Sequence, residues 1–577
     1  MKKNQKLLSK YEKWDVVGKS QITNHPIRKT SSSNEASKFQ KEDLTKTLLL
    51  NRGIKTKKQR EDYFTPTHPE KIKLADMGMD KKSVQKAIER LKSALKNKEK
   101  VIIFGDYDVD GICSSAIIWE YLYGLGLDVT PYIPERFSEG YGIKAESIDK
   151  LKKENPDLTL IITVDNGIVA FDAVKKAEKE GIDILIIDHH EKGERYPDAH
   201  SIIHTTKLCG SAISWVMVRE IGQVIDKSHD VRNSLELAAL GTVADQMPLI
   251  GVNRSFVKYG LEDLNNTKRL GLSVLYESAG IQKGNVGVYE INYVIAPRLN
   301  AMGRLENAIE SLRLLCTKSK KRAYELSELL NKTNSKRQKI VEEVTLKAKE
   351  MLKNKKLERI IILDDESYHE GVIGLAASKL VEEYFRPSIV ISKGKVISKG
   401  SARSISGFNI IKAIRSAPDL LLGGGGHEMA AGFSLKSKDL PAFKKQLEKY
   451  ALKNVSNELL QKKTKVDMKL DFSNLSGDLV SLFKKMEPFG IGNPTPAFIT
   501  KNCSILDVKR VGKNGNHLKF KLKKEDVVFD AISFSDLNQA SDFLPDRKAD
   551  VLYNLEENYW NGYVSLQLKL KDLKYSI

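Results

Sequence analysis

One stretch decides the expected fold: Val101-Ile-Ile-Phe-Gly-Asp106-Tyr-Asp108-Val-Asp110-Gly111. Its apolar, β-branched run is typical of a parallel strand that is buried on both faces. Two later runs repeat the pattern, because 158–164 leads into Asp165 and 182–187 leads into Asp188-His189-His190. In parallel sheets, ligands gather beyond the carboxyl ends of the strands. The three runs therefore predict that carboxylates and imidazoles converge at one edge of a sheet.

The residue types at these strand ends indicate a metal site. Asp106, Asp108 and Asp110 alternate, so in an extended segment they share a face, where three carboxylates repel one another unless cations lie among them. A single D-x-D is more often an exposed polar turn, but the buried strand and the two further runs favour metal binding. His189 and His190 add imidazoles, which together with carboxylates suit Mn²⁺ or another borderline divalent ion, whereas Mg²⁺ prefers oxygen ligands.

One further carboxylate, Asp245, ends a stretch of small and apolar residues and is a candidate ligand in this context. Two divalent ions about 3.5–4 Å apart form the usual clamp for hydrolysis of phosphate esters. The sequence has neither the G-x-S-x-G nucleophile motif nor the G-x-x-x-x-G-K-[ST] phosphate loop. We therefore predict a two-metal phosphodiesterase that does not depend on ATP.

The composition favours a polyanionic partner. The chain has 577 residues, a net charge of +20 and a pI near 9.3. Residues 1–60 hold 16 Lys and Arg against 5 Asp and Glu, a net charge of +11. Neutralising phosphates with such charges releases counterions, although a solvated tail is an equally good interpretation of this segment. Four scattered cysteines and the lack of a long apolar run lead us to expect a cytoplasmic protein without a membrane span.

The order of local patterns predicts three folded domains. Strand-like runs alternate with helical stretches from about residue 82 to 260, which indicates a parallel sheet. A long charged helix, a second α/β unit and a set of short alternating strands follow. The expected divisions are a basic, partly flexible tail (1–45), an α/β domain with an N-terminal helical part (46–317), a connecting helix (318–356), a second α/β domain (357–462) and a β-barrel (463–577).

Several segments could bind phosphate. The glycine run 423–426 could be a flexible turn or a backbone nest that holds an anion. Arg304 and Arg403 offer guanidinium groups suited to phosphate. Near the C-terminus, lysines interleave with His517 and Phe520, a pattern that either binds single strands or forms an ordinary solvated strand face. These lysines are Lys513, Lys519, Lys521, Lys523 and Lys524.

Seven motifs in order make the chain similar to a known family. From about residue 80 to the C-terminus it resembles the RecJ branch of the DHH phosphoesterases, which are single-strand-specific DNA exonucleases. The motifs are Ile133-Pro-Glu-Arg136-Phe-Ser-Glu-Gly140-Tyr-Gly142, the run to Asp245, Pro297-Arg-Leu-Asn300-Ala-Met-Gly-Arg304, His369-Glu-Gly-Val-Ile-Gly374, Ser401-Ala-Arg-Ser404, Gly425-Gly-His427 and Pro488-Phe-Gly-Ile-Gly-Asn-Pro494.

The resemblance implies 5′→3′ degradation of single-stranded DNA to 5′-mononucleotides, in DNA repair or recombination, with two Mn²⁺ or Mg²⁺ ions. It also implies a DHH domain, a DHH-associated domain and a C-terminal OB-fold barrel. By motif position, the implied ligands are Asp108, Asp110, Asp165, His189 and Asp245, with Asp165 bridging. Asp106 is a further ligand or a base, and Asp188 and His190 orient ligands or substrate. The implied DNA-binding residues are Arg136, Arg304, Ser401, Arg403 and His427.

Two other functions remain open on sequence alone. One is a DHH phosphodiesterase that acts on oligonucleotides or cyclic dinucleotides, although such enzymes typically lack a barrel. The other is a non-catalytic relative that binds single strands, for which degenerate ligands would be expected. We expect a monomer, with a single-strand-binding protein or a helicase as candidate protein partners.

Overall fold

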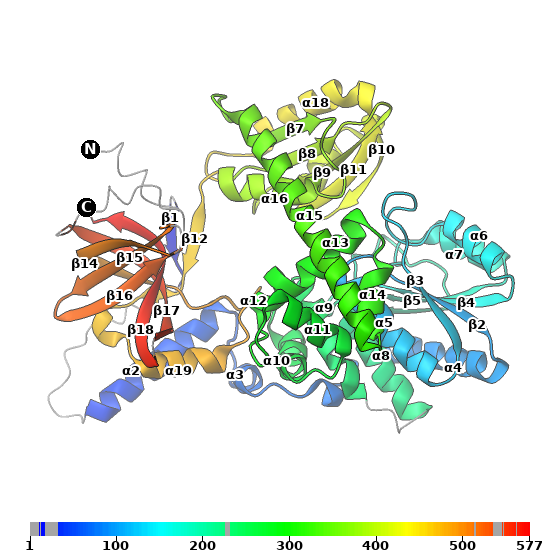
Figure 1. The fold of residues 1–577 in the computed structure, drawn as a ribbon, viewed down its shortest axis with the longest axis horizontal. Coiled ribbons are helices and arrows are strands. Elements are labelled where there is room, and N and C mark those ends of the chain that lie inside the picture. Colours follow the sequence, from blue (N-terminus) through cyan, green and yellow to red (C-terminus); the bar gives the residue numbers. More distant parts are fainter. Residues whose placement is uncertain are drawn as a thin grey trace. The chain divides into compact units, whose positions relative to one another are not determined.

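The computed structural model describes residues 11, 13–17, 33–225, 231–512, 515–534, 545, 547–560 and 562–576 (Figure 1). The chain divides into two compact units, which are described separately. One unit holds residues 61–340 and 488–493, and the other holds 1–60, 341–487 and 494–577. All four cysteines are free thiols.

The first unit is built on a five-stranded parallel sheet with the order β3-β2-β4-β5-β6. The three runs that end in aspartate form its central strands β2, β4 and β5, which confirms the predicted parallel sheet. The edge strands β3 and β6 were not expected. The strands are β2 (Lys100–Phe104), β3 (Asp128–Tyr132), β4 (Leu158–Val164), β5 (Asp183–Asp188) and β6 (Ser201–His204).

Side chains alternate between the two faces of this sheet and bury against different helices. Ile103 and Ile162 pack in the core formed with α4 (Lys81–Asn97), α5 (Val109–Gly124) and α8 (Gly210–Val224). Ile102 and Ile161 pack on the opposite face against α6 (Ala145–Glu154) and α7 (Phe171–Lys179). Both faces are covered, which explains why the strands are nearly continuous apolar runs.

The chain reverses its direction of winding between β2 and β4. Helix α5 leads from β2 to β3 on one side, and α6 leads back to β4 on the other side of β2. Connections that leave neighbouring strands in opposite directions open a crevice at their carboxyl ends, where ligands bind. Asp106 and Asp165 follow β2 and β4 and therefore lie at this switch point.

Further helices complete the first unit. The long helix α15 (Figure 1) covers Lys320–Leu352 of the range 318–356 in which we expected a helix. The two units divide within this helix, between Ile340 and Val341. The remaining helices are α9 (Leu235–Ala244), α10 (Gly251–Asn265), α11 (Leu270–Ala279), α12 (Val288–Glu290), the π-helix η3 (Ile291–Ile295), α13 (Ala296–Leu305) and α14 (Ile309–Cys316).

The second unit begins its α/β part with a mixed sheet of order β10-β11-β9-β8-β7, in which only β7 and β8 are parallel. The glycine run 423–426 lies in the edge strand β10, so our expectation of a turn or an anion nest was wrong. Pairing with β11 keeps it extended. The elements are β7 (Ile361–Asp365), α16 (Ile373–Tyr384), β8 (Ser388–Ser392), β9 (Ile397–Arg403), α17 (Ile410–Ile414), β10 (Leu421–Gly426), β11 (Ala430–Lys436) and α18 (Leu440–Asn454).

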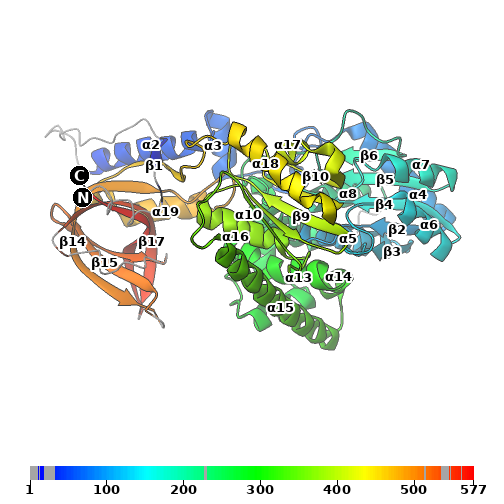
Figure 2. The same cartoon turned by 90° about the horizontal axis from the view of Figure 1, so that it is seen from above.

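The C-terminal part of this unit is the predicted barrel (Figure 2). Its strands follow the order β14-β15-β16-β18-β17, and β17 pairs back with β14 to close the ring. The strand β13 (Met468–Lys469) pairs with β14 and extends this sheet. Helix α19 (Gly477–Met486) lies between β13 and β14 in the chain. The barrel strands are β14 (Phe498–Val511), β15 (His517–Lys524), β16 (Val527–Ser533), β17 (Lys548–Trp560) and β18 (Tyr563–Tyr575).

Part of the expected basic tail has regular structure. Strand β1 (Lys13–Val16) pairs in parallel with β12 (Lys463–Val466). Helix α2 (Ser33–Asn51) begins within the range assigned to the tail, and α3 (Lys57–Phe64) follows it. The rest of the tail, residues 1–10, 12 and 18–32, lies outside the described residues.

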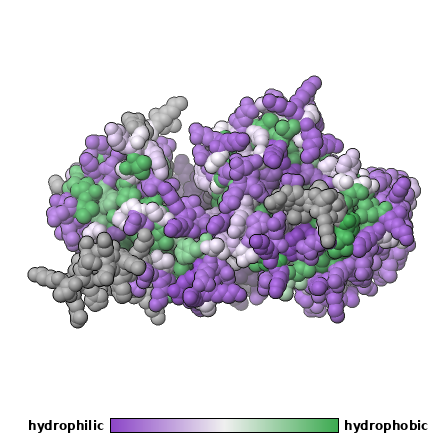
Figure 3. Space-filling model, turned by 90° about the horizontal axis from the view of Figure 1, so that it is seen from below, coloured by the Kyte–Doolittle hydropathy of each residue, from purple (hydrophilic) through white to green (hydrophobic). Residues whose placement is uncertain are grey.

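Hydrophilic residues predominate on the face of the molecule in Figure 3, with apolar residues in separate smaller patches. None of the described helices has both the length and the apolar content needed to cross a bilayer.

Candidate metal centre

The loop after β2 brings its three carboxylates together by turning into a helix. Asp110 lies in the first turn of α5, and Asp108 caps this helix by accepting the backbone N–H groups of Asp110 and Gly111 at 2.9 and 3.0 Å. A Cβ on Gly111 would lie 2.6 Å from the Cβ of Asp106, so only glycine permits so tight a turn. The carboxylates thus converge through a strand–loop–helix turn and not, as we expected, through an extended segment.

Asp110 is held from the opposite side by the first residues of α8. Gly210 and Ser211 donate their backbone N–H groups to its two carboxylate oxygens at 2.6 and 3.0 Å. The neighbouring helix α9 approaches so closely that a Cβ on Gly241 would lie 2.4 Å from Oδ1 of Asp110. The sequence analysis missed these three supporting residues. Gly241 lies in the stretch of small residues that leads to Asp245, and this stretch could have indicated that α9 packs closely against its neighbours.

Asp165 stands at the centre of the cluster. It follows β4 in a left-handed conformation with φ of 62°, and its Oδ1 lies 3.1 Å from Nε2 of His189. The same Nε2 lies 3.8 Å from a carboxylate oxygen of Asp110 and 3.8 Å from one of Asp245, which ends helix α9. One imidazole therefore faces three carboxylates that come from different elements.

Asp188 organises the turn that carries the two histidines. Its Oδ1 lies 2.8 Å from Nδ1 of His190 and accepts the backbone N–H groups of His189 and His190. Its Oδ2 accepts the N–H of Ile168, beyond the turn after β4. Asp188 therefore ties the ends of β4 and β5 together.

All eight acidic and histidine residues predicted for the catalytic site lie in this one region. Potential ligand atoms fall within 4.8 Å of one another in three groups. The groups are Asp106, Asp108 and Asp165; Asp110, His189 and Asp245; and Asp165, His189 and His190. Asp165 and His189 each belong to two groups, so they connect two neighbouring subsites.

The crowding is visible in the acid–base properties of the carboxylates. Burial, with the charges of neighbouring aspartates, raises the pKa of Asp106, Asp108 and Asp165. Burial and the charges of Asp110 and Asp108 raise the pKa of Asp245 to about 8. Each shift reflects the cost of placing several negative charges in a buried site, and cations among them would offset that cost.

The two histidines differ in their preferred charge. Burial lowers the pKa of His189, which favours the neutral imidazole that ligates metals. Burial also opposes a charge on His190, but the hydrogen bond and charge of Asp188 outweigh it and raise the pKa of His190 to about 9. His190 and Asp188 thus form an ion pair beside the cluster, whereas His189 is suited to be a ligand.

The residues fit divalent cations. The Oδ1 atom of Asp106 is buried and has no hydrogen-bond partner among the described residues. A buried oxygen without a partner costs about 1–3 kcal/mol, which a bound cation would offset. Several carboxylates with one neutral imidazole form a donor set that suits Mn²⁺ and accommodates Mg²⁺.

Two tyrosines that the sequence analysis did not single out line the cluster. The hydroxyl of Tyr141 donates to the backbone oxygen of Asp165 at 3.3 Å and lies 3.2 Å from Nε2 of His190. Tyr107 packs edge-on against Tyr141, and the guanidinium of Arg136 lies 4.9 Å from the centre of its ring. Burial raises the pKa of Tyr107 to about 12. Tyr141 lies within a quoted motif, but no local pattern distinguished it.

Helix α13 supports the loop that carries Asp106 and Asp108. Oδ1 of Asn300 accepts the N–H of Val109 at 3.0 Å, and a Cβ on Gly303 would lie 2.5 Å from the backbone oxygen of Tyr107. The predicted DNA-binding residue Arg304 is next to Gly303, and its positive charge partly offsets the rise that burial causes in the pKa of Tyr107. Arg304 and Arg136 therefore both lie close to Tyr107, at the cluster.

The other three predicted DNA-binding residues lie in the second unit. Arg403 of β9 donates to the hydroxyl of Ser401 at 3.3 Å. His427 follows β10 and pairs with Ala430, which lies opposite Arg403 in the sheet. Ser401 lies opposite Gly432, which in turn lies opposite Gly425, and both glycines are exposed. This sheet face is therefore open between Ser401 and the edge strand.

In the barrel strand β15, the lysines and Phe520 do not form the joint single-strand-binding surface that their spacing suggested. Phe520 is buried inside the barrel, so it cannot stack on a base, and Lys519 on the outer face pairs with Asp530 at 2.8 Å. The period of two along the strand separates the aromatic residue from the lysines. Lys513 lies outside the described residues.

Comparisons with known proteins agree with this architecture. Residues 100–242 match the DHH family, N-terminal domain, residues 357–453 match the DHHA1 domain, and residues 466–572 match the RecJ OB domain.

Two relatives and one solved structure cover most of the chain. The single-stranded-DNA-specific exonuclease RecJ of Bacillus subtilis is 34% identical over 541 residues, which cover 92% of this chain and 68% of the relative. The protein of the same name from Thermus thermophilus is 33% identical over 85% of this chain and 71% of its own length. A crystal structure of Thermus thermophilus RecJ in complex with Mn²⁺ superposes with a TM-score of 0.79 at 27% identity, covering 98% of this chain and 80% of that one.

Proposed function

This chain belongs to the RecJ family of single-stranded-DNA-specific exonucleases, and from this premise we propose that its strand-end cluster hydrolyses the phosphodiester bonds of single-stranded DNA with two divalent cations. The enzyme is a metal-dependent exonuclease. The observation that carries the proposal is the set of three adjoining ligand groups, in which Asp165 and His189 each belong to two groups and so connect them.

The residues of the cluster have two roles, because some would bind the cations and others hold these ligands in position. Asp106, Asp108 and Asp165 form one subsite, and Asp110, His189 and Asp245 form the other, with Asp165 between them. Bound divalent cations would activate a water molecule and offset charge on the attacking and leaving oxygens. Gly210 and Ser211 hold Asp110 in place, and the ion pair of Asp188 and His190 holds the turn that carries His189. This support keeps the ligands in position before substrate arrives.

Substrate positioning falls to cationic residues near the cluster. Arg136 and Arg304 lie at the wall formed by Tyr107, where their guanidinium groups can hold phosphate oxygens. On the second unit, Ser401, Arg403 and His427 line a sheet face whose exposed glycines leave room for a nucleic-acid backbone. The barrel supplies a further single-strand-binding surface.

We infer the finer properties from family membership. The enzyme proceeds 5′→3′, releases 5′-mononucleotides and serves DNA repair or recombination in the cytoplasm. It acts as a monomer, with a single-strand-binding protein or a helicase as candidate partners.

Digestion of end-labelled strands tests polarity and strandedness together. With Mn²⁺, a 5′-labelled single strand should lose its label as mononucleotide from the start, whereas a 3′-labelled strand should shorten progressively. A blunt duplex is the control and should persist. Label released first from the 3′ end, or equal digestion of duplex, would refute the proposal.

The rival function within the fold is hydrolysis of short oligonucleotides. The match to the RecJ OB domain over residues 466–572 favours long strands. Comparing the rate on a dinucleotide with the rate on a long single strand separates the two functions. Faster turnover of the dinucleotide would overturn our assignment. A non-catalytic role is disfavoured because the chain keeps every expected carboxylate and histidine of the cluster.

A further inference from the structure

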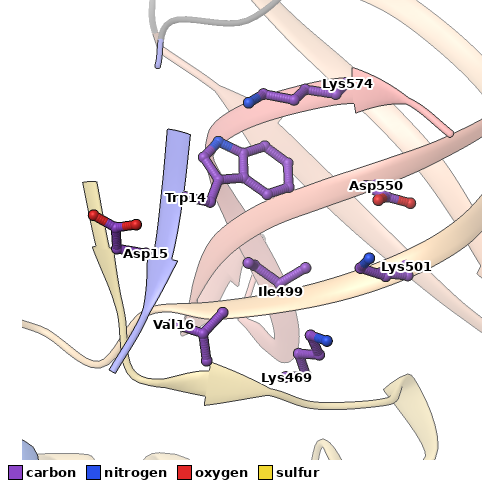
Figure 4. Close-up of a pocket in the computed structure, with 8 residues that line it drawn as sticks. All are labelled: Trp14, Asp15, Val16, Lys469, Ile499, Lys501, Asp550 and Lys574. Atoms are coloured by element: carbon purple, nitrogen blue, oxygen red, sulfur yellow. The ribbon is translucent and has the colours of Figure 1, made fainter. Parts of the chain in front are cut away.

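The pocket between strand β1 and the barrel is filled on its apolar side by the protein itself (Figure 4). Ile499 is 3% exposed and packs with the indole of Trp14 in a small apolar cluster. The ammonium group of Lys574 lies 4.6 Å from the centre of the same indole, and the indole Nε1–H donates to Oδ2 of Asp572 at 2.7 Å. This pocket therefore reflects how β1 docks on the barrel.

The segment that carries the two histidines of the metal centre is not an ordinary connection between parallel strands. Such strands are usually joined by a helix that packs on the sheet. Between β5 and β6, however, residues 189–200 form neither a helix nor a strand, and residues 191–196 are exposed. Helix packing therefore does not hold this segment, and the position of His189 depends on individual hydrogen bonds to its turn.

One of these hydrogen bonds comes from His204, the last residue of β6, which no motif singled out. His204 lies opposite Asp188 in the register of β5 and β6. Its Nε2 lies 2.8 Å from the backbone oxygen of His190. Asp188 accepts the backbone N–H groups of His189 and His190, whereas His204 binds the carbonyl group that follows them. Together they hold the backbone of the turn at both of its ends.

The contact with the turn also defines which ring nitrogen of His204 carries a proton. A carbonyl oxygen can only accept a hydrogen bond, so Nε2 of His204 must donate. In a neutral imidazole the other nitrogen, Nδ1, then accepts, and the hydroxyl of Tyr196 lies 3.4 Å from it. Tyr196 belongs to the exposed part of the loop, where the ammonium group of Lys192 lies 4.5 Å from the centre of its ring. Tyr196 is therefore placed to favour the tautomer that holds the turn.

We propose that His204 is a positioning residue that holds His189 in place for metal ligation, and that Tyr196 orients the ring of His204. The inference rests on the proposed function, because the position of His189 matters only if the cluster binds cations. Nε2 of His189 lies within 3.8 Å of three carboxylates, so any displacement of its turn changes three distances in the cluster at once.

Manganese binding in the absence of DNA measures this effect directly. The full chain is titrated with Mn²⁺, and the EPR signal of the free ion reports binding without any cleavage. Loss of a group that supports a metal ligand costs about 10–100-fold in metal affinity, and His204 acts through the backbone, so His204→Leu should weaken binding about tenfold. The side-chain amide of His204→Gln can donate to the same carbonyl group, so this variant should recover most of the affinity.

The matched control is His200→Leu, which makes the same change immediately before β6. His200 lies 3.6 Å from Asp183, the first residue of β5, and thus at the end of the sheet away from the cluster. This variant should bind Mn²⁺ as tightly as the unaltered chain. Thermal unfolding in EDTA shows whether each variant is folded before metal is added.

The variant Tyr196→Phe tests the role of the hydroxyl. Tyr196 is exposed, so the change should not disturb the fold. Without the hydroxyl, Nδ1 of His204 loses its donor, and affinity for Mn²⁺ should fall several-fold, though less than in His204→Leu. The KM for a single strand at saturating Mn²⁺ should stay the same in both variants. Unchanged manganese affinity in Tyr196→Phe would overturn the proposal, even if His204→Leu failed to fold.

The remaining outcomes separate this inference from the proposed function. An equal loss of manganese affinity in His204→Leu and His200→Leu, or no recovery in His204→Gln, would show that His204 does not act through the turn. If instead manganese affinity depends on His204 as expected but the unaltered chain does not degrade single-stranded DNA, the proposed function fails and the positioning role of His204 stands.

Discussion

Asp165 combines an unusual backbone conformation with a central position in the ligand cluster. Its φ of 62° lies in the left-handed region, which aspartate and asparagine tolerate better than most residues. A Cβ on Gly210 would lie 2.8 Å from its Cβ, so the side chain is also confined by its neighbours. Strained backbone of this kind persists where the surroundings over-determine it, often at functional sites.

Replacing Asp165 by asparagine tests its role without disturbing its backbone. Asp165→Asn removes the charge that we assign to both metal subsites, so cleavage of single-stranded DNA should fall about 100-fold or more, or about 2.7 kcal/mol. Thermal unfolding should show a folded protein, and strand binding should persist. The control Asp172→Ala alters an exposed aspartate of α7 and should cleave normally. Full activity in Asp165→Asn would remove this residue from the mechanism.

The close packing around Asp110 predicts that a larger residue at position 241 lowers both stability and activity. A Cβ at position 241 would lie 2.0 Å from Oγ of Ser211 and 2.4 Å from Oδ1 of Asp110, so Gly241→Ala should displace the carboxylate. Overpacking should destabilise the fold by about 1–3 kcal/mol and lower activity tenfold or more. Denaturant unfolding and cleavage assays measure the two effects. At Gly193 the same change meets nothing within 4 Å, so Gly193→Ala is the control. Equal behaviour of the two variants would contradict the packing argument.

At the scale of elements, the strands that could be predicted from the sequence are those whose residues form a clear local pattern. Strands β2, β4 and β5 are nearly continuous apolar runs because both faces of the sheet are covered, and their aspartates marked the site. The edge strands were missed because their residues are mixed, as in Asp128-Val-Thr-Pro-Tyr132. The conformation of residues 423–426 depends on pairing with β11, which no local pattern shows.

The same limit applies within the site. The residues of the cluster could be predicted to lie together because each follows a recognisable run or motif. Their supports could not, because Asn300 reaches Val109 across 191 positions of the chain, and Gly210 reaches Asp110 across 100. Such contacts appear only when separate elements pack together.

Arg52, the residue that follows helix α2, should stabilise the second unit through a buried ion pair. Arg52 is almost fully buried and lies 3.0 Å from Asp467, and it also donates to the backbone oxygens of Leu48 and Pro494. Arg52→Ala leaves the carboxylate of Asp467 without this partner, which should cost about 3–5 kcal/mol. Chemical denaturation measures the loss. Lys58→Ala, at an exposed position nearby, should cost less than about 0.5 kcal/mol. Equal stability of the two variants would show that the ion pair is unimportant.

On the scale of the whole molecule, the net charge is positive although the proposed metal site is acidic. The chain carries +20 overall, yet the residues that we propose as metal ligands form a compact acidic cluster in the unit that holds residues 61–340. A positive protein attracts the DNA strand, while the acidic cluster needs cations before it can accept a phosphate.

Metal binding should therefore raise stability. Mn²⁺ at 100 times its dissociation constant stabilises the folded state by about 2.7 kcal/mol, because the unfolded chain lacks the site. Differential scanning calorimetry should show a higher midpoint with Mn²⁺ than with EDTA. The shift should shrink in Asp165→Asn and remain in Asp172→Ala. An equal shift in all three proteins would place the stabilising ions elsewhere.

Anomalous diffraction from crystals grown with Mn²⁺ tests the central claim most directly, because it locates the ions themselves. The account predicts two manganese peaks, one among Asp106, Asp108 and Asp165 and the other among Asp110, His189 and Asp245, with Asp165 between them. A single peak, or peaks away from these carboxylates, would contradict it.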